Sequence, residues 1–476
     1  MTNIQSKLVP VTVPCTQYAH PWTDSCWNST AGLLLQASQH SLRIYTAVYL
    51  LSLITRGRIP TPRDIKRTIL GILQSSAFLT TNAFSFIMFT CLLRHVLGTF
   101  HFITVSYVPA FLASLCAIFV ERPARRILLT LYVANVATET AWSMAASRGI
   151  VKSIPHGQAI IFGTSASILL YLYRRGLHHQ YQDSLFNIFR FVVGGDEEGR
   201  RPTGADESAE SPAEALGVEG IEGAVGAEDR VGRRQRRNHY SDISFLVRIY
   251  VQLLDKIKSQ SKHKSCPHNY SCLYYSVSGG SRLFMVGFGL QVTLKIVLQL
   301  KKLLQRKLSL KKVIFNRETL KLGVFLGGFS FLFRSISCSL RHITGFDHPL
   351  YAIPAGLAAS CAFTKYPDVT VALYVMWKML QISYNIGVDK GYLPKVPGFQ
   401  TLLYCASTAL LFHVGIFEPL NLRPSYWKFL HGISGGRVAI MDRSAFDVWG
   451  LDSSKAVLET LKLTKTQAGK VKFAFS

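Results

Sequence analysis

The chain has 476 residues and a formal net charge of +26, yet only 17% of its residues are charged and 49% are hydrophobic. This composition, with a positive mean hydropathy of +0.21, argues against an ordinary soluble protein of two or three domains. The basic residues are spread over many loops rather than gathered on one motif, which argues against nucleic acid as a partner and favours a lipid membrane.

Eight apolar segments, rich in Leu, Ile, Val, Phe and Ala, recur along the chain between basic and aromatic residues, a pattern typical of membrane interfaces. A helix needs roughly 20 such residues to cross the hydrocarbon layer, and several segments lie at or below the short limit. The alternative is a large soluble helical protein with long apolar core helices. The predicted spans are 69–93, 102–120, 127–146 and 158–173, then 322–340, 349–364, 369–388 and 399–417.

Two further segments, 32–54 and 282–300, precede the two groups of spans. Arg43 lies in the first and Lys295 in the second, so we expect both to be amphipathic helices at the membrane interface. If they cross the membrane instead, each group has five spans and the two groups are inverted. The distribution of Lys and Arg among the loops predicts cytosolic termini and two parallel four-span groups.

The segment 194–238 is rich in Gly, Glu, Ala and Arg and has almost no large apolar residues, which predicts a disordered linker. Basic residues follow it and form a dense series before the second group of spans. We expect that series to contact anionic lipid; it comprises Lys301, Lys302, Arg306, Lys307, Lys311 and Lys312. The predicted divisions are 1–68 (N-terminal region), 69–193 (first repeat), 194–238 (linker), 239–321 (second cysteine cluster with basic helix), 322–417 (second repeat) and 418–476 (basic cytosolic tail).

Cysteines mark an internal duplication with an offset of about 245 residues. The spacing of Cys91, Arg94 and Gly98 recurs in Cys338, Arg341 and Gly345, and only Cys405 among the nine cysteines lacks a counterpart. Four cysteines lie in or beside apolar segments, and we expect them to pack as small hydrophobic residues. They are Cys91, Cys116, Cys338 and Cys361.

A Cys/His cluster opens each half of the chain. Together the two clusters offer four thiolates and two imidazoles, and zinc favours four such ligands in a tetrahedron, but the spacing matches no standard zinc finger. Reduced cysteines that pack an N-terminal cap are the favoured interpretation, while a jointly bound zinc ion and a disulfide stay open. The six residues are Cys15, His20, Cys26, Cys266, His268 and Cys272.

Charged residues also lie inside the predicted spans. Glu139 is near the middle of the third span, and Lys378 is near the middle of the corresponding span of the second repeat. Such residues are costly in a bilayer, so we expect them to pair with other helices or to line a polar groove. Arg334 is a weaker candidate because its side chain can extend toward Arg341 and the interface.

Small residues at four-residue spacing indicate where helix backbones approach closely. The pairs are Gly323 with Gly327, Ala113 with Ala117, Gly356 with Ser360, and Gly163 with Ser167. We find no phosphate-binding glycine loop, nucleophile elbow or zinc-protease helix, so we expect neither an enzyme nor a cofactor.

The cysteine-containing start, the run Ala-Thr-Glu-Thr at 137–140, the stretch Leu-Arg-Pro-Ser-Tyr-Trp-Lys-Phe at 422–429 and the duplication resemble the transmembrane protein 135 family, also called peroxisomal membrane protein 52. That family is distantly similar to the four-helix subunits of mitochondrial inner-membrane translocases. The resemblance implies a multi-pass protein of peroxisomal and mitochondrial membranes, with a role in mitochondrial fission through a dynamin-related GTPase, in peroxisome organisation and in lipid metabolism.

The sequence therefore predicts an all-α membrane protein with two tandem four-span repeats, each preceded by a Cys/His cluster and an amphipathic helix. The favoured function is that of a non-enzymatic organelle-membrane regulator. The alternative is a transporter or a conduit for cholesterol or fatty acid, in which Glu139 and Lys378 line a groove.

Overall fold

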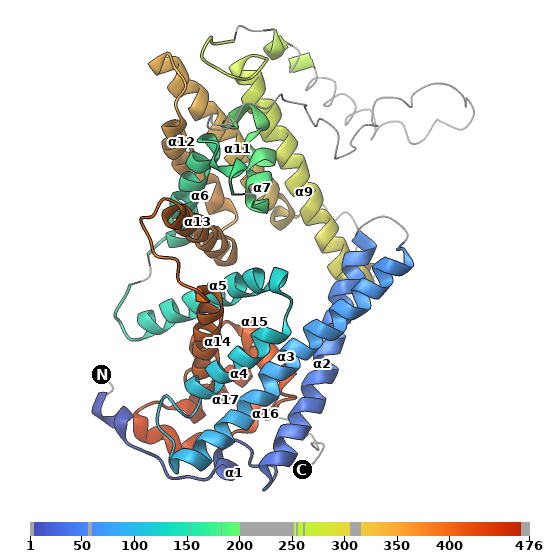
Figure 1. Cartoon of the computed structure of the whole chain (residues 1–476). Coiled ribbons are helices and arrows are strands. Elements are labelled where there is room, and N and C mark those ends of the chain that lie inside the picture. Colours follow the sequence, from blue (N-terminus) through green and yellow to red (C-terminus); the bar gives the residue numbers. More distant parts are fainter. Residues whose placement is uncertain are drawn as a thin grey trace, which may run out of the picture. The chain divides into compact units, whose positions relative to one another are not determined.

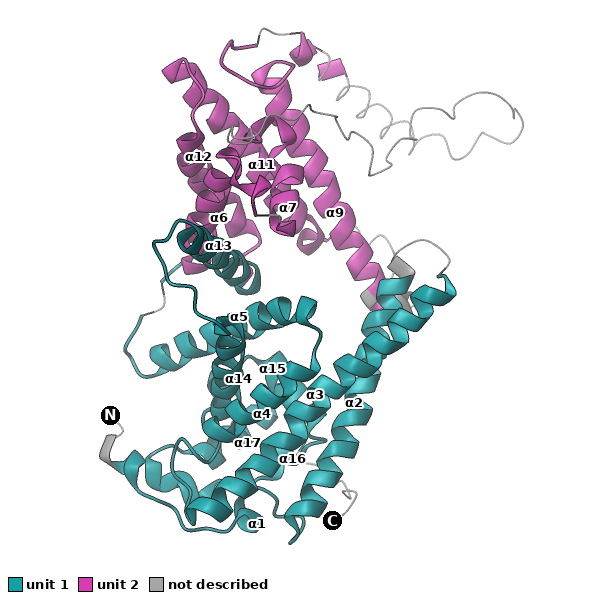
Figure 2. Cartoon of the chain, viewed as in Figure 1, with its two compact units in different colours: residues 1–155, 369–476 teal, residues 156–368 magenta. Residues whose placement is uncertain are grey.

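The computed structural model describes residues 4–55, 60–152, 154–181, 183–199, 252–253, 256–259, 262–304 and 316–467. These residues are helical apart from loops and one isolated bridge between Val11 and Phe100. The chain forms two compact units (Figure 2). Unit 1 comprises residues 1–155 and 369–476, and unit 2 comprises residues 156–368. The prediction of an all-α fold is thus confirmed for the described residues.

Unit 1 contains the N-terminal helices and the C-terminal part of the chain from residue 369 (Figure 1). Its N-terminal elements are η1 (Ile4–Leu8), α1 (Cys15–Tyr18), α2 (Cys26–Thr55), α3 (Pro62–Leu97), α4 (Tyr107–Val120) and α5 (Pro123–Ser147). Its C-terminal elements are α13 (Val369–Asp389), α14 (Phe399–Phe417), η6 (Pro419–Asn421), α15 (Pro424–Ile433), α16 (Arg437–Ile440), η7 (Ser444–Trp449) and α17 (Ser453–Thr464).

Unit 2 contains the central part of the chain. Its elements are α6 (Gly157–Arg174), η2 (Leu177–His179), α7 (Ser184–Val193), η3 (Gly195–Glu197), α9 (Cys272–Leu304), α11 (Arg317–Thr344), η4 (Pro349–Tyr351), α12 (Ala352–Ala359) and η5 (Ser360–Lys365). The predicted repeats and the compact units are different divisions of the chain. The fourth apolar helix of the first repeat, α6, packs on α12 in unit 2, and that of the second repeat, α14, packs on α4 and α5 in unit 1.

The two equivalent helices α3 and α11 begin and end on matching local signals. Thr61 and Asp64 form a capping box at the start of α3, and the Asn316 side chain accepts from a backbone N–H at the start of α11. Both helices end at a glycine in the left-handed conformation, Gly98 with φ 70° and Gly345 with φ 78°. The duplicated sequence therefore sets the same helix boundaries twice.

Each of these helices has a long antiparallel neighbour. The Tyr49 ring of α2 lies against Gly71 of α3, while the start of α2 lies near the C-terminal part of α3. In unit 2, a Cβ atom on Gly327 of α11 would lie 2.7 Å from the carbonyl oxygen of Gly280 of α9. One on Gly323 would lie 2.9 Å from that of Phe284. The predicted close packing at Gly323 and Gly327 is thus observed.

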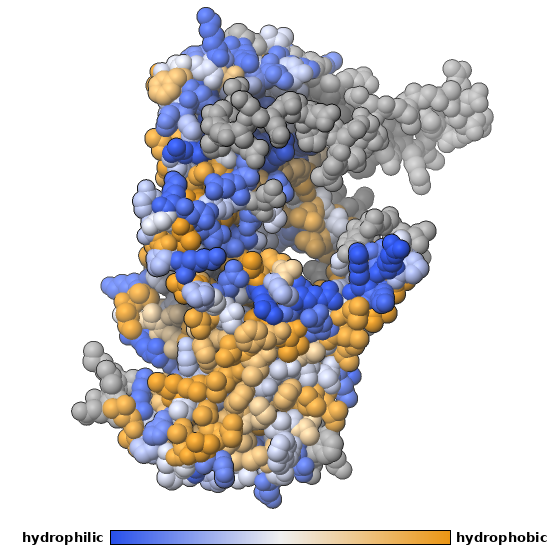
Figure 3. Space-filling model, viewed as in Figure 1, coloured by the Kyte–Doolittle hydropathy of each residue, from blue (hydrophilic) through white to orange (hydrophobic). Residues whose placement is uncertain are grey.

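Segments 32–54 and 282–300 form parts of α2 and α9, which run along the length of α3 and α11 (Figure 1). The outward faces of α2 and α9 carry exposed apolar side chains rather than a polar face, which differs from the expected amphipathic pattern, and Figure 3 shows apolar residues over much of the visible face of unit 1. Close backbone approach at the glycines of α9 and α11 allows the packing in unit 2. The position of these helices at the membrane interface stays a prediction.

Among the described residues, three helices are long and apolar enough to cross a membrane: α3, α11 and α14. The tandem four-span repeats stay a prediction. The second predicted span of the first repeat is short in the structure, because α4 has 14 residues. At 1.5 Å per residue α4 is about 21 Å long, below the roughly 30 Å of the hydrocarbon layer. The second predicted span of the second repeat is helical from Pro349 to Lys365, as η4, α12 and η5 in succession.

The predicted close contacts of small residues in unit 2 bring α6 and α12 together. Gly163 and Ser167 of α6 face Ser360 and Gly356, and a Cβ atom on Gly356 would lie 3.0 Å from the Cα atom of Ser167. The two small-residue pairs named from the sequence are therefore partners of each other. They lie on helices from different repeats, which periodicity within one helix does not reveal.

Two other sequence expectations need correction. The first residues of the predicted disordered linker, 194–199, are ordered, and Glu197 in η3 is 3% exposed. The rest of the linker, residues 200–238, lies outside the described residues. The segment from 418, expected as a basic tail, forms α15, α16, η7 and α17 against the core of unit 1, where Trp427 and Trp449 are fully buried. Aromatic burial outweighs the basic composition of this segment.

Candidate metal centres and buried charges

The first Cys/His cluster gathers four side chains in unit 1. Cys15, His20, Cys26 and Cys91 place their ligand atoms within 4.8 Å of one another. The Sγ atoms of Cys15 and Cys26 are 3.5 Å apart, and the Cys91 Sγ is 3.4 Å from His20 Nε2. Cys26 is the first residue of α2 and Cys91 lies near the end of α3, so the cluster joins the open end of the hairpin to the N-terminal segment.

The second cluster repeats this arrangement in unit 2. Cys266, His268, Cys272 and Cys338 also lie within 4.8 Å of one another. The Sγ atoms of Cys266 and Cys272 are 3.6 Å apart, and the Cys338 Sγ is 3.4 Å from His268 Nε2. Cys272 begins α9 and Cys338 lies near the end of α11, which reproduces the positions of the first cluster.

Backbone carbonyls orient the two imidazoles. His20 Nδ1 donates to the Thr23 carbonyl at 2.9 Å, and His268 Nδ1 donates to the Tyr270 carbonyl at 2.7 Å. Both rings are buried, with exposed fractions of 0% and 1%. Because Nδ1 carries the proton, Nε2 is left as a lone-pair donor directed at the thiols.

This geometry changes the interpretation of the cysteines. From the sequence, the two leading clusters were expected to offer one joint zinc site, and Cys91 and Cys338 were expected to pack as small hydrophobic residues. Instead each cluster is completed by the cysteine of its own hairpin, giving two separate sets of three thiols and one imidazole. Cys91 and Cys338 occupy equivalent positions in the duplication, and this equivalence could have indicated that each belongs to the cluster of its own repeat. Their role as fourth members of the clusters was missed because they lie far from the leading cysteines in the sequence and inside apolar helices.

The thiols outside the long hairpin helices differ in acidity. Hydrogen bonds with Cys91 and then His20 lower the pKa of the Cys15 thiol to about 4. Burial raises the pKa of Cys266 to about 11. A cluster that stabilises one thiolate through its neighbours can present anionic sulfur, the form in which cysteine binds metals.

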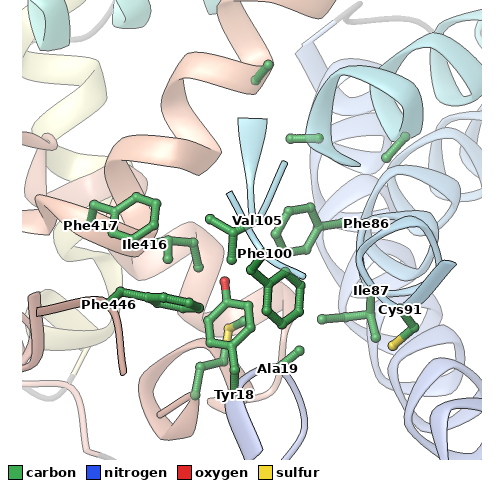
Figure 4. Packing of buried hydrophobic residues seen from close by; sticks show 14 of the residues in the cluster. Tyr18, Ala19, Phe86, Ile87, Cys91, Phe100, Val105, Ile416, Phe417 and Phe446 are labelled. Carbon is green, nitrogen blue, oxygen red and sulfur yellow. The ribbon is translucent and has the colours of Figure 1, made fainter. Parts of the chain in front are cut away.

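The surroundings of the first cluster are aromatic. Tyr18, Phe100 and Phe446 pack edge to face, with centroid distances of 4.6 to 6.1 Å, and Cys91 lies at the margin of this group (Figure 4). Arg94, one helical turn after Cys91, donates to the Val13 carbonyl at 2.8 Å and to the Thr12 carbonyl at 2.6 Å. These contacts hold the segment that leads into Cys15.

Buried charges surround the second cluster instead. Arg341, the counterpart of Arg94, is fully buried and donates to both carboxylate oxygens of Glu197, at 2.9 and 2.5 Å. It also donates to Asp347 at 2.8 Å, and Arg174 contacts both acids. Tyr275 donates to the Val193 carbonyl at 3.1 Å beside this network. The residues just after α7 are thereby fixed to α11.

The charged residues predicted inside the spans have partners in the structure. Glu139 of α5 forms an ion pair with Arg423, the residue that precedes α15. Lys378 of α13 is 4% exposed. The Arg334 guanidinium lies 4.4 Å from the centroid of the Tyr275 ring and donates to the Tyr275 carbonyl at 3.1 Å, so it packs on α9 rather than extending toward Arg341.

The basic residues proposed for anionic lipid fall mostly beyond the described part of the chain. Lys301 and Lys302 lie in the last turn of α9, where side chains are not described, and the other four lie outside the described residues. The four are Arg306, Lys307, Lys311 and Lys312.

The described part of unit 1 contains an apolar cavity and a polar hollow. An apolar cavity of about 60 Å³ has walls from α2, α3, α14 and α15, with Leu33, Phe86 and Leu430 among its lining residues. A polar hollow of about 210 Å³ near the basic end of α3 is lined by Arg67 and Arg122, among others. Neither Glu139 nor Lys378 lines either hollow.

A helical chain with several candidate membrane-crossing helices and exposed apolar helix faces is a multi-pass membrane protein. A family model for the N-terminal cysteine-rich region of Transmembrane protein 135 matches residues 12–146, which include all four members of the first Cys/His cluster. The match confirms the resemblance to the transmembrane protein 135 family and supports membership of the chain in it. A search of the solved structures found no match.

Proposed function

We propose that the chain is a non-enzymatic protein of the peroxisomal or mitochondrial membrane that regulates mitochondrial fission and peroxisome organisation and has a role in lipid metabolism. The family match supports this assignment, since these are the roles that the resemblance implies. A dynamin-related GTPase is the proposed partner, and the basic loops and the segment 200–238 are its proposed contact region.

The observation that carries the choice of a regulator over a conduit is the ion pair between Glu139 and Arg423. A carboxylate that lines a substrate path is expected to face water or a ligand. Here the carboxylate fastens α5 to the start of α15, and the neighbouring Thr138 accepts a hydrogen bond from the Trp377 indole of α13 at 3.1 Å. Glu139 therefore acts in helix packing.

The size of the apolar cavity supports the same choice. Pockets for drug-sized ligands have volumes of roughly 300–1,000 Å³, and the cavity in unit 1 has about 60 Å³. It is too small for a sterol or an acyl chain. The polar hollow beside Arg67 and Arg122 suits an anionic headgroup at the membrane surface, which is a means of anchoring rather than of transport.

Two assays on one set of variants separate regulator from conduit. In cells that lack the protein, we expect the full chain to restore mitochondrial fission, and a chain without residues 200–238 to reach the same abundance without restoring it. In vesicles reconstituted with the purified chain, we expect sterol and fatty acid to move no faster than in vesicles without protein. Glu139→Gln should lower abundance through lost helix packing and leave vesicle transfer unchanged.

Arg148→Gln is the matched control, since it removes another ion pair of unit 1, the one with Glu418. A conduit is indicated if the chain accelerates lipid movement and Glu139→Gln, at normal abundance, abolishes it while Arg148→Gln does not. The regulator proposal also fails if the chain without 200–238 restores fission as well as the full chain.

A further inference from the structure

We propose that each Cys/His cluster binds one Zn²⁺ ion through three thiolates and one imidazole, so that the chain carries two structural zinc ions. The first site consists of Cys15, His20, Cys26 and Cys91, and the second of Cys266, His268, Cys272 and Cys338. Each ion joins the segment before a hairpin to both helices of that hairpin.

Two interatomic distances in each cluster match the edges of a zinc tetrahedron, and all four ligand atoms lie within 4.8 Å of one another. With Zn–S bonds of about 2.3 Å and Zn–N bonds of about 2.0 Å, the edges are about 3.8 Å between two sulfurs and about 3.5 Å between sulfur and nitrogen. The observed S–S distances are 3.5 and 3.6 Å, and both S–N distances are 3.4 Å. A disulfide requires about 2.05 Å between sulfurs, so the geometry favours a metal over a disulfide.

The imidazoles are arranged as zinc ligands are. In protein zinc sites, the ring nitrogen that does not bind the metal usually donates to a carbonyl or carboxylate, which fixes the ring and its tautomer. His20 and His268 both donate from Nδ1 to a carbonyl two or three residues later and direct Nε2 toward a cysteine. Packing alone gives no reason for this orientation to occur in both clusters.

Because the chain is duplicated, the same ligand arrangement can be compared at two separate places in the molecule. The three leading ligands have different spacings, 15-20-26 in the first cluster and 266-268-272 in the second, so their backbones follow different paths. The ligand atoms nevertheless reach the same arrangement beside Cys91 and Cys338. Two unlike loops that converge on one geometry indicate a common requirement at the centre of each cluster.

The donor set selects zinc. Thiolate ligands favour Zn²⁺, Cu⁺ and iron–sulfur clusters over hard cations, and three sulfurs with one imidazole is a common structural zinc set. Four protein ligands fill the tetrahedron and leave no open position for a substrate, so these are structural rather than catalytic sites. In both sites one thiol is at the first residue of a long helix.

The test measures metal in the full chain purified in detergent without chelators. Elemental analysis should give two zinc ions per chain. Cys91→Ser and Cys338→Ser should each reduce this to one, and the double variant should contain none. Cys405→Ser and Cys116→Ser are matched controls, because these cysteines lie outside both clusters, and they should retain two ions.

A measurement on the unaltered chain covers the case in which a variant does not fold. Native alkylation should modify the six cluster cysteines only after a zinc chelator is added. Exchange with Co²⁺ should give the visible spectrum of a tetrahedral thiolate complex. The proposal is overturned if the chain purified without chelators contains no metal, if peptide mapping shows a Cys15–Cys26 or Cys266–Cys272 disulfide, or if both serine variants retain two ions. Loss of zinc in only one serine variant refutes the site at the other cluster.

Discussion

The two Cys/His clusters share one ligand geometry and differ in what holds them. In unit 1, Arg94 donates to backbone carbonyls of the segment before Cys15. In unit 2, its counterpart Arg341 is fully buried and pairs with the carboxylate of Glu197. The duplication has therefore kept the candidate metal site while its support changed from neutral acceptors to a buried ion pair. Because a buried charge is costly without its partner, the second unit should be the more sensitive one.

The largest effect is expected from breaking the ion pair of unit 2. Glu197→Ala leaves the Arg341 charge buried without its main partner, and such losses typically cost about 3–5 kcal/mol. The denaturant concentration at which Cys338 becomes open to alkylation should fall strongly, while that for Cys91 in unit 1 should be unchanged.

The neighbouring Glu198→Gln is the control, because Glu198 is 19% exposed and pairs with the exposed Arg190 and with His178 rather than with a buried arginine. Its cost should be clearly smaller than that of Glu197→Ala, since it leaves no unpaired buried arginine. The double variant Glu197→Leu with Arg341→Met should recover most of the loss, since it removes both charges. If Glu197→Ala and Glu198→Gln have equal effects, the buried pair does not hold unit 2.

The next effect contrasts the two hairpins. In α11, a Cβ atom at Gly327 would lie 2.7 Å from a backbone oxygen of α9, which is not free to move. Gly327→Ala should therefore cost about 1–3 kcal/mol in unit 2. At Gly71 of α3 the obstacle is the ring of Tyr49, the far end of a side chain that can rotate, so Gly71→Ala should cost clearly less.

Gly289→Ala calibrates this comparison, because nothing lies within 4 Å of a Cβ atom there. It should stabilise α9 by about 0.5–1 kcal/mol through helix propensity. Thermal unfolding of the purified variants measures all three. Equal losses of stability in Gly71→Ala and Gly327→Ala would mean that both hairpins accommodate an added methyl group equally well.

A smaller loss is expected at the support of the first cluster. Arg94→Met removes hydrogen bonds to the carbonyls of Thr12 and Val13 but leaves no buried charge behind, so the cost should be about 1–2 kcal/mol. Protection of Cys15 from alkylation should decrease while that of Cys266 is retained. Arg94→Lys, which keeps the charge but not the planar donors, is the control and should behave like Arg94→Met. If Cys15 in Arg94→Lys is as well protected from alkylation as in the native chain, the positive charge of Arg94 and not its planar hydrogen-bond donors supports the cluster.

Features that depend on residues close together in the sequence could be predicted from local patterns. Contacts between residues far apart in the sequence could not. The helical class and the small-residue pairs depend on local signals and were predicted. The pairing of Glu197 with Arg341 joins residues 144 positions apart, and the composition around Glu197 indicated disorder instead. Local composition does not record the burial that a distant helix provides.

The candidate metal site shows the same limit. The leading cysteines and histidines were identified as possible ligands, but the fourth ligand of each set lies in an apolar helix, where a cysteine is usually a packing residue. Hairpin formation brings Cys91 and Cys338 to the clusters, and the sequence patterns did not predict that α2 pairs with α3 and α9 with α11. Once those two helices are antiparallel to α3 and α11, the ligand sets follow.

The smallest effect concerns the pH dependence of unit 2. Burial alone would raise the pKa of Asp347, but the hydrogen bond from Arg341 and the nearby charge of Arg174 outweigh it and lower the pKa below 3.8. A carboxylate with a lowered pKa contributes stability above its unfolded pKa, and loses it as pH falls through the lower folded value. Because the side chain is 41% exposed, the contribution should be below about 1 kcal/mol.

Asp347→Asn should therefore destabilise unit 2 slightly at pH 7 and reduce the difference in stability between about pH 5 and pH 3. Alkylation of Cys338 at each pH measures this, and Cys91 in the same sample reports any acid effect common to both clusters, such as protonation of the ligands. The difference between the native chain and Asp347→Asn isolates the carboxylate. An equal pH dependence of Cys338 in the two proteins would show that Asp347 does not contribute to the distinction between the units.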